Sequence, residues 1–195
     1  ITERLEKVRA LRKSSNADRI QKMADYPYLF CQIRQPLSTY LVFPRHSSQN
    51  RRYIPIGFMP SSVIAGDACS IIPNVTIYEF GVLTSNVHNA WMRVTCGRIK
   101  SDFRYSPAVK NNFPWPTPTL EQNAKIEQTA QAILNARAMY PNNWLADLYK
   151  PLSMPEPLLK AHIANDRAVM QAYGLSVKDT SEADCVAFLM KRYQE

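Results

Sequence analysis

The chain has 195 residues, of which 46% are hydrophobic and 21% charged, and a formal net charge of +8. That length and apolar share suffice for one large domain or for two small domains around a common core. A transmembrane helix is excluded because no apolar run approaches the roughly 20 residues that cross a bilayer. Residues 1–13 are charged and unlike a signal peptide. Because the chain begins with Ile1 rather than Met, we expect the gene product to extend further upstream.

The positive charge is concentrated in the first part of the sequence. Residues 1–113 carry 16 lysines and arginines against 7 acidic residues, whereas residues 114–195 carry 8 against 9. This asymmetry is expected when one domain faces a polyanion and the other does not. A basic surface without any partner would have the same composition, so charge alone leaves both interpretations open.

Short helices followed by short strands are predicted for the first part of the chain. Residues 2–13 and 17–24 have helical patterns and are polar enough to form a linker. The β-branched and aromatic segments that follow predict strands, and these are 39–43, 52–58, 68–72 and 76–80. The polar residues 44–51 between the first two strands have the length of a hairpin loop.

A helix is predicted to begin near Thr84 or Ser85, both of which are good N-caps. Its apolar residues Val87, Ala90, Trp91 and Val94 recur at helical spacing and define one buried stripe, so Trp91 is interpreted as a core residue. Gly97 is well placed to end this helix as a C′ residue. Basic and apolar residues then alternate over 98–105, which predicts a strand with charges on one face.

The last third of the chain is predicted to be helical. The proline-rich segment 112–118 marks a domain boundary. Capping-box patterns predict helices that begin at Thr119, with Gln122, and at Ser153, with Glu156, and a last helix begins near Ser181. The expected fold class is therefore α+β, with a small mixed or antiparallel sheet domain followed by a helical bundle.

No catalytic or metal-binding constellation is evident. The four cysteines are widely spaced, as expected for free thiols of a cytoplasmic protein rather than for disulfides or zinc. None of the five glycines forms a phosphate-binding loop, and the acidic residues of the basic part are isolated. We therefore predict no catalytic, cofactor-binding or metal-binding residues in this chain.

Two groups of basic and hydrogen-bonding side chains are the candidate binding residues. The first comprises Arg45, Ser47, Ser48, Gln49, Asn50, Arg51 and Arg52, and the second comprises Arg93, Arg98, Lys100, Ser101 and Arg104. Guanidinium groups mixed with short donors suit the phosphates of nucleic acid, and Asn, Gln and Arg can also read base edges. We predict that phosphates are bound by Arg45, Arg51, Arg52, Arg98 and Lys100. The candidate base readers are Gln49, Asn50, Arg93 and Arg104. A solvated polar loop is the alternative for the first group.

Long segments of the sequence resemble the MmeI-like DNA methyltransferases, which are class I S-adenosylmethionine-dependent enzymes, many of them restriction–modification proteins. The similar segments are 44–58, 80–93, 96–106, 111–116, 148–155 and 161–174. Lys150 departs from the acidic residue expected in many relatives. The tetrapeptide 112–115 also resembles the Asn-Pro-Pro-aromatic motif of amino-methyltransferases, but Phe113 replaces a proline, and we interpret the segment as a domain hinge.

The resemblance implies a target-recognition domain, 26–116, between a helical linker, 1–25, and a C-terminal helical domain, 117–195. The catalytic domain, with its S-adenosylmethionine site, would lie upstream in the same polypeptide of a prokaryotic, cytoplasmic protein. The implied partner is double-stranded DNA, and the implied reaction is methyl transfer, usually to adenine N6.

Three alternatives remain open on the residues alone. The basic face could bind an acidic protein, or the chain could be an independent enzyme, although no set of convergent titratable residues supports this. A single-stranded RNA could stack on aromatic residues beside the basic ones, and the candidates are Tyr26, Tyr28, Phe103 and Tyr105.

Overall fold

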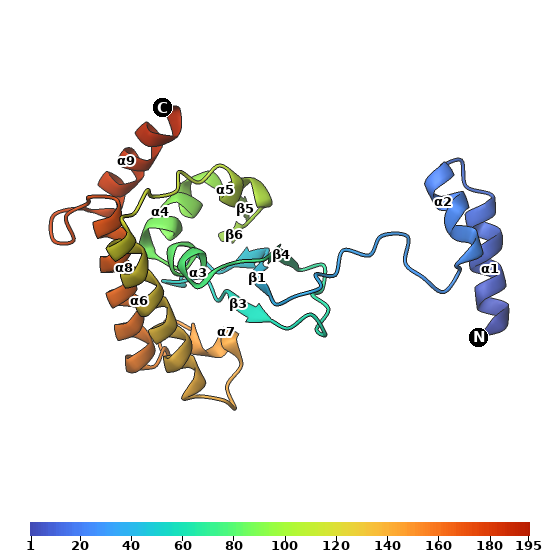
Figure 1. The fold of residues 1–195 in the computed structure, drawn as a ribbon, viewed down its shortest axis with the longest axis horizontal. Helices are drawn as coiled ribbons and strands as arrows, with labels where there is room; N and C mark the ends of the chain where they lie inside the picture. Colours follow the sequence, from blue (N-terminus) through green and yellow to red (C-terminus); the bar gives the residue numbers. More distant parts are fainter. The chain divides into compact units, whose positions relative to one another are not determined.

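The computed structural model describes residues 1–195, which form two compact units, 1–36 and 37–195. The first unit contains α1 (Thr2–Lys13), α2 (Asp18–Lys22) and the 3-10 helix η1 (Met23–Asp25) (Figure 1). Arg12 joins these helices to the segment after them, because its guanidinium donates to the carbonyls of Met23, Tyr26 and Leu29. The helix predicted at 2–13 is confirmed, and the one predicted at 17–24 is divided between α2 and η1.

This division also splits the positive charge of the first part of the sequence. Residues 1–36 carry 8 lysines and arginines against 4 acidic residues, and residues 37–113 carry 8 against 3. The excess charge therefore belongs to two separate units, rather than to one basic domain.

The second unit contains two small antiparallel sheets, and the first of them has β1 at its centre. β1 (Tyr40–Pro44) pairs with β3 (Gly57–Met59) on one side and β4 (Cys69–Pro73) on the other. The strand predicted at 52–58 forms only at its end. Residues 53–56 are largely buried but irregular, and Pro55 among them has no N–H to donate to a ladder.

The other sheet has the strand order β2-β6-β5 and joins distant parts of the sequence. Its strands are β2 (His46–Ser47), β5 (Gly97–Ile99) and β6 (Asp102–Arg104). Three predictions were wrong here. Residues 44–51 are not a simple hairpin loop, and residues 98–105 form a hairpin rather than one strand, because Lys100 turns the chain with a φ of 55°. Gly97 begins β5 instead of capping the preceding helix in the left-handed conformation.

The helix α3 (Ile77–Leu83) stands where a strand was predicted at 76–80. The β-branched and aromatic residues favoured a strand, but Thr76 and Glu79 form a capping box that begins a helix. The next helix, α4 (Asn86–Thr95), begins after Ser85 as predicted. Its stripe is buried at Trp91, whereas Val94 is 52% exposed and does not belong to it.

The last third is helical as predicted. After the short helix α5 (Pro107–Asn111) come α6 (Leu120–Ala138), α7 (Leu145–Leu148), α8 (Glu156–Ala172) and α9 (Glu182–Gln194). The capping box of Thr119 and Gln122 is confirmed, and Ser181 caps α9. Ser153 does not cap α8: its hydroxyl donates to the carbonyl of Asp147, and Pro155 is the N-cap. No helix combines the length and the apolar character needed to cross a bilayer.

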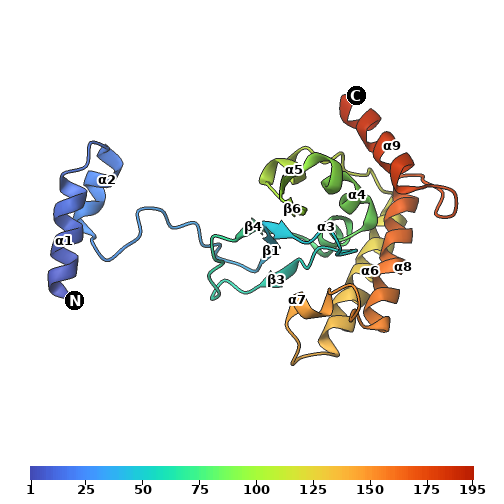
Figure 2. The same cartoon turned by 180° about the vertical axis from the view of Figure 1, so that it is seen from behind.

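The core of the second unit continues across the proline-rich segment that was predicted to be a boundary. Phe113 is 3% exposed and makes ring contacts with His88 and Trp91 before that segment, with Trp115 within it and with Tyr173 after it. Helices α6 and α8 lie side by side (Figures 1 and 2). Helix α3 packs on both of them, and Phe80 of α3 also contacts Phe58 of β3. The sheet and the helical bundle are therefore packed as one body.

Candidate nucleic-acid interface

The sheet β2-β6-β5 brings together the two groups of basic residues that the sequence separates. Arg104 pairs with His46 on one side and with Gly97 on the other, and Phe103 pairs with Ser47 and Arg98. Side chains of directly paired residues lie on the same face of a sheet, with Cβ atoms about 5 Å apart. By this rule Arg104 shares one face of the sheet with His46, and Arg98 shares the other face with Ser47 and Phe103. The sheet therefore brings members of the two groups together, without placing all of them on one face.

Three cations of this sheet and its turns are available to a ligand. The side chains of Arg45, Lys100 and Arg104 are exposed, and the structure gives them no hydrogen bond or ion pair. Their charge is thus uncompensated by neighbours. Such a group attracts phosphates and retains its full set of donors for them.

Arg98 is exposed but already oriented. Its guanidinium stacks over the ring of Phe103, 4.4 Å from the ring centroid, and donates to the carbonyl of Ser101 at 3.1 Å. Ser101 itself is exposed in the turn of the β5–β6 hairpin. Stacking of this kind fixes a guanidinium without neutralising it.

The predicted polar residues of β2 and the loop after it differ in exposure. Gln49 and Asn50 are exposed, and the turn is closed by the N–H of Arg51, which donates to the carbonyl of Ser48 at 3.1 Å. Ser47 is only 4% exposed, and its hydroxyl has no hydrogen-bond partner. Ser47 therefore does not reach the surface on which the predicted ligand would lie.

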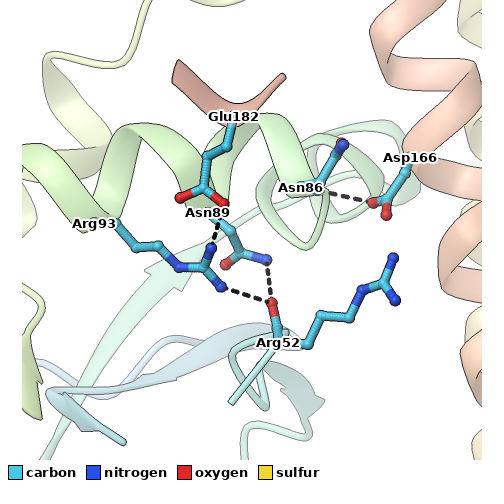
Figure 3. A network of polar contacts seen from close by, with 6 residues as sticks. All are labelled: Arg52, Asn86, Asn89, Arg93, Asp166 and Glu182. Atoms are coloured by element: carbon cyan, nitrogen blue, oxygen red, sulfur yellow. Dashed lines mark hydrogen bonds and ion pairs between the residues drawn. The ribbon is translucent and has the colours of Figure 1, made fainter. Parts of the chain in front are cut away.

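Two of the remaining predicted residues, Arg51 and Arg93, are engaged by the helical part of the molecule, and Figure 3 shows the contacts of Arg93. Arg51 donates to the carbonyl of Ala146 at 3.2 Å. Arg93 forms an ion pair with Glu182, with 2.6 Å between Nη1 and Oε2. The guanidinium of Arg52 lies over the ring of Tyr53, 5.4 Å from its centroid. The contacts with the helical part therefore distinguish Arg51 and Arg93 from the exposed cations of the sheet, whereas Arg52 is exposed and stacked like Arg98.

A buried group of titratable residues, Tyr53, His162 and Asp166, lies next to Arg52. Asp166, 5% exposed, accepts hydrogen bonds from the hydroxyl of Tyr53 at 2.6 Å and from the N–H of Asn86 at 2.8 Å. Burial raises the pKa of Asp166 to about 6, although both hydrogen bonds act in the opposite direction. The ring of His162 stacks on Tyr53, and burial holds the pKa of His162 well below its usual value.

This buried group has no access to a substrate. Four surface cavities of about 80 to 290 Å³ are lined by other residues. No three His, Cys, Asp or Glu side chains are grouped so that they could hold a metal ion, and the four cysteines are free. The arrangement therefore suits structural support, while the exposed sheet suits the binding of a polyanion.

The structure also corrects two other expectations. Of the four aromatic residues considered for stacking on single-stranded RNA, Phe103 and Tyr105 are 5% and 4% exposed and cannot stack on a base, whereas Tyr26 and Tyr28 are 50% and 66% exposed. His46 was not among the predicted residues, yet it is exposed beside Arg104. Only the pairing of β2 with β6 reveals its place, and that pairing joins residues about 58 positions apart, which no local pattern indicates.

Two domain families match this chain, one over the part that contains both sheets and one over the helices that follow. Residues 1–117 match the family described as "MmeI, target recognition domain", and residues 119–195 match "MmeI, C-terminal domain". DNA methyltransferase A of Bacillus subtilis (strain 168) is 33% identical over 196 residues, which cover 100% of this chain and 22% of that protein.

A solved structure is similar as well. The Type IIL restriction-modification enzyme MmeI, determined in complex with DNA, matches with a TM-score of 0.86 and 44% identity over 99% of this chain and 26% of the MmeI chain. The chain thus spans about a quarter of the length of these relatives. The two family matches together cover nearly every residue, and the chain belongs to the MmeI family, of which it comprises the target recognition and C-terminal domains.

Proposed function

We propose that this chain binds duplex DNA with sequence preference, as the recognition part of a DNA methyltransferase of a restriction–modification system. The observation that carries the proposal is the sheet β2-β6-β5, which brings exposed cations without ion-pair partners from two distant parts of the sequence onto one small sheet and its turns. The similar MmeI structure was determined in complex with DNA, which supports DNA as the ligand of this chain.

Within this sheet and its turns, we assign phosphate binding to Arg45, Arg98 and Lys100. Their cations are exposed at the ends of the strands, where they can fix the register of the duplex without reading it. Arg104 lies in the central strand, and Gln49 and Asn50 lie at the tip of the adjoining loop. A forked guanidinium suits guanine, and a side-chain amide suits adenine, so these three residues are the candidate base readers.

The chemistry is assigned to the rest of the methyltransferase. We propose that S-adenosylmethionine binds there, and that the target base, by the resemblance an adenine methylated at N6, is extruded from the duplex that this chain holds. This division agrees with the structure, in which the buried Asp166 and His162 have no access to a substrate.

The test is the salt dependence and sequence preference of binding by the 195-residue chain. A random pool of 20-base-pair duplexes is selected on the protein, and the selected duplex is titrated at several salt concentrations. The double variant Arg45→Ala, Lys100→Ala should reduce the slope of log K against log salt by about 1.8, because each neutralised phosphate contributes about 0.9. Lys178→Ala, an exposed charge beyond α8, is the control and should keep the wild-type slope.

Base reading is tested on the same duplex. Arg104→Ala should reduce the preference for the selected duplex over a scrambled one by about 1–3 kcal/mol, with most change at one base pair. An unchanged slope and an unchanged preference in these variants would refute the assignment. Stronger competition by single-stranded RNA than by duplex DNA would refute the proposed function itself.

A further inference from the structure

We define the recognition loop as residues 48–51. The two residues that follow it are fixed by contacts with distant helices. Before the loop, β2 is paired with β6, and after it the chain passes through Arg52 and Tyr53. These two consecutive residues are bound by side chains of helices α4 and α8, which lie far away in the sequence. Figure 3 shows the contacts at Arg52, and Glu182 of α9 binding Arg93.

The first attachment is made to the carbonyl of Arg52. It accepts a hydrogen bond from Nδ2 of Asn89 at 3.3 Å and one from Nη2 of Arg93 at 3.5 Å. Each bond is long, so neither donor alone would fix the carbonyl. Glu182, the first residue of α9, binds the other terminal nitrogen of Arg93 at 2.6 Å and so fixes the direction of its guanidinium.

The second attachment is made to the side chain of Tyr53. Its hydroxyl donates to Asp166 of α8 at 2.6 Å, and its ring stacks on His162 with 4.1 Å between centroids. Asp166 is in turn fixed by the N–H of Asn86 in the first turn of α4, where a carboxylate also suits the helix dipole. Tyr53 is 1% exposed, so this attachment is enclosed by the core.

From this arrangement we propose that Arg93 and Glu182 are positioning residues for DNA recognition, which together with Asp166 hold the end of the recognition loop from the helical domain. The inference rests on the proposed function and assigns Arg93 a role other than DNA contact. A loop that is ordered before binding loses less entropy on the duplex and presents its side chains at defined base positions. The attachments are made to backbone and core atoms, so they leave the exposed Gln49 and Asn50 free for the ligand.

Glu182→Gln separates this role from direct contact. The variant retains the size of the side chain but removes the charge that holds Arg93. If Arg93 positions the loop, discrimination between the selected and the scrambled duplex should fall by about twofold to fivefold, the range expected for one partly exposed ion pair. The salt slope should stay unchanged because no phosphate contact is lost. If Arg93 instead binds a phosphate, its release should leave discrimination unchanged and strengthen binding to both duplexes.

Glu156→Gln is the matched control. Glu156 is also the first residue of a long helix and is ion-paired, but its partner Lys160 belongs to the same helix, at 2.7 Å. The control changes the net charge equally and should keep the wild-type discrimination. Arg93→Lys is the second variant: it retains the cation but not the fork that reaches Glu182 and Arg52 together, so discrimination should fall with the salt slope unchanged.

Hydrogen exchange of the free protein gives a readout without DNA. Amides of residues 48–52 should exchange faster in Glu182→Gln than in the wild type or in Glu156→Gln, with the exchange of α6 unchanged. Wild-type exchange and wild-type discrimination in both Glu182→Gln and Arg93→Lys would overturn the inference while leaving the proposed function intact. A wild-type chain that binds no duplex would overturn the proposed function and, with it, this role for the attachments.

Discussion

Replacing Asp166 with Asn should make the protein more sensitive to acid between about pH 4 and 6. Burial raises the pKa of Asp166 from 3.8 to about 6, so the folded protein binds a proton there that the unfolded chain does not bind at the same pH. This contribution to the free energy of unfolding is fully present below pH 3.8 and is lost as the pH rises through 6. It amounts to about 3 kcal/mol, at about 1.4 kcal/mol per unit of pKa.

The buried histidines act in the opposite direction. Burial lowers the pKa of His88 from 6.5 to about 4 and holds that of His162 well below 6.5. Their contribution is present above pH 6.5 and is lost as the pH falls, because the unfolded chain then takes up protons. Near pH 5 the folded protein binds about one proton on Asp166 that the unfolded chain does not bind, which opposes the histidines. Asp166 therefore lowers the slope of the free energy of unfolding against pH by about 1.4 kcal/mol per pH unit.

Asp166→Asn removes the proton that the folded state binds there, so the slope near pH 5 should increase by about 1.4 kcal/mol per pH unit. The measurement is urea unfolding at pH 4.5, 5.0, 5.5 and 6.0. Asp179→Asn, which changes an exposed carboxyl, is the control and should retain the wild-type slope. If the free energy of unfolding depended on pH in the same way in Asp166→Asn and the wild type, Asp166 would take up no proton on folding, and the reasoning would be refuted.

Two further predictions concern helix α3. In Gly81→Ala the new Cβ would lie 2.8 Å from Cγ2 of Ile126 and 3.0 Å from Cβ of Ala130. This crowding should outweigh the gain in helix propensity, so the free energy of unfolding, measured in urea, should fall by about 1–2 kcal/mol. Gly66→Ala, with no atom within 4 Å, should change stability by less than about 0.5 kcal/mol, and equal effects of the two would contradict this packing. Thr76→Ala removes the capping box of α3 and should cost about 1 kcal/mol in the same assay. Wild-type stability would mean that packing alone fixes the start of the helix.

Local patterns predicted the helices well where capping and periodicity agreed. The capping box of Thr119 and Gln122 correctly begins α6, and Ser181 correctly caps α9. At residues 76–80 the two indications disagreed: β-branched and aromatic residues suggested a strand, while Thr76 and Glu79 carried an equally clear capping pattern. The capping pattern was the better guide there because it reports hydrogen bonds that only a helix start makes.

The candidate site was harder to predict because its geometry is nonlocal. The sequence indicated the two basic groups, but not that β2 pairs with β6 and joins them. It also gave Arg93 the same weight as Arg98, since nothing near Arg93 in the sequence shows that Glu182, 89 residues later, takes up its charge. Composition identifies cations, and only tertiary contacts decide which of them remain free for a ligand.

The recognition loop now has a physical boundary on each side. His46 and Ser47 are fixed by pairing with β6, and Arg52 and Tyr53 are fixed by the helical domain. The four residues between them contribute little to the core, because two are exposed and the other two only half-buried. Substitutions within 48–51 can therefore change the groups presented to DNA at little cost in stability, whereas substitutions at the attachments change how precisely any such groups are presented.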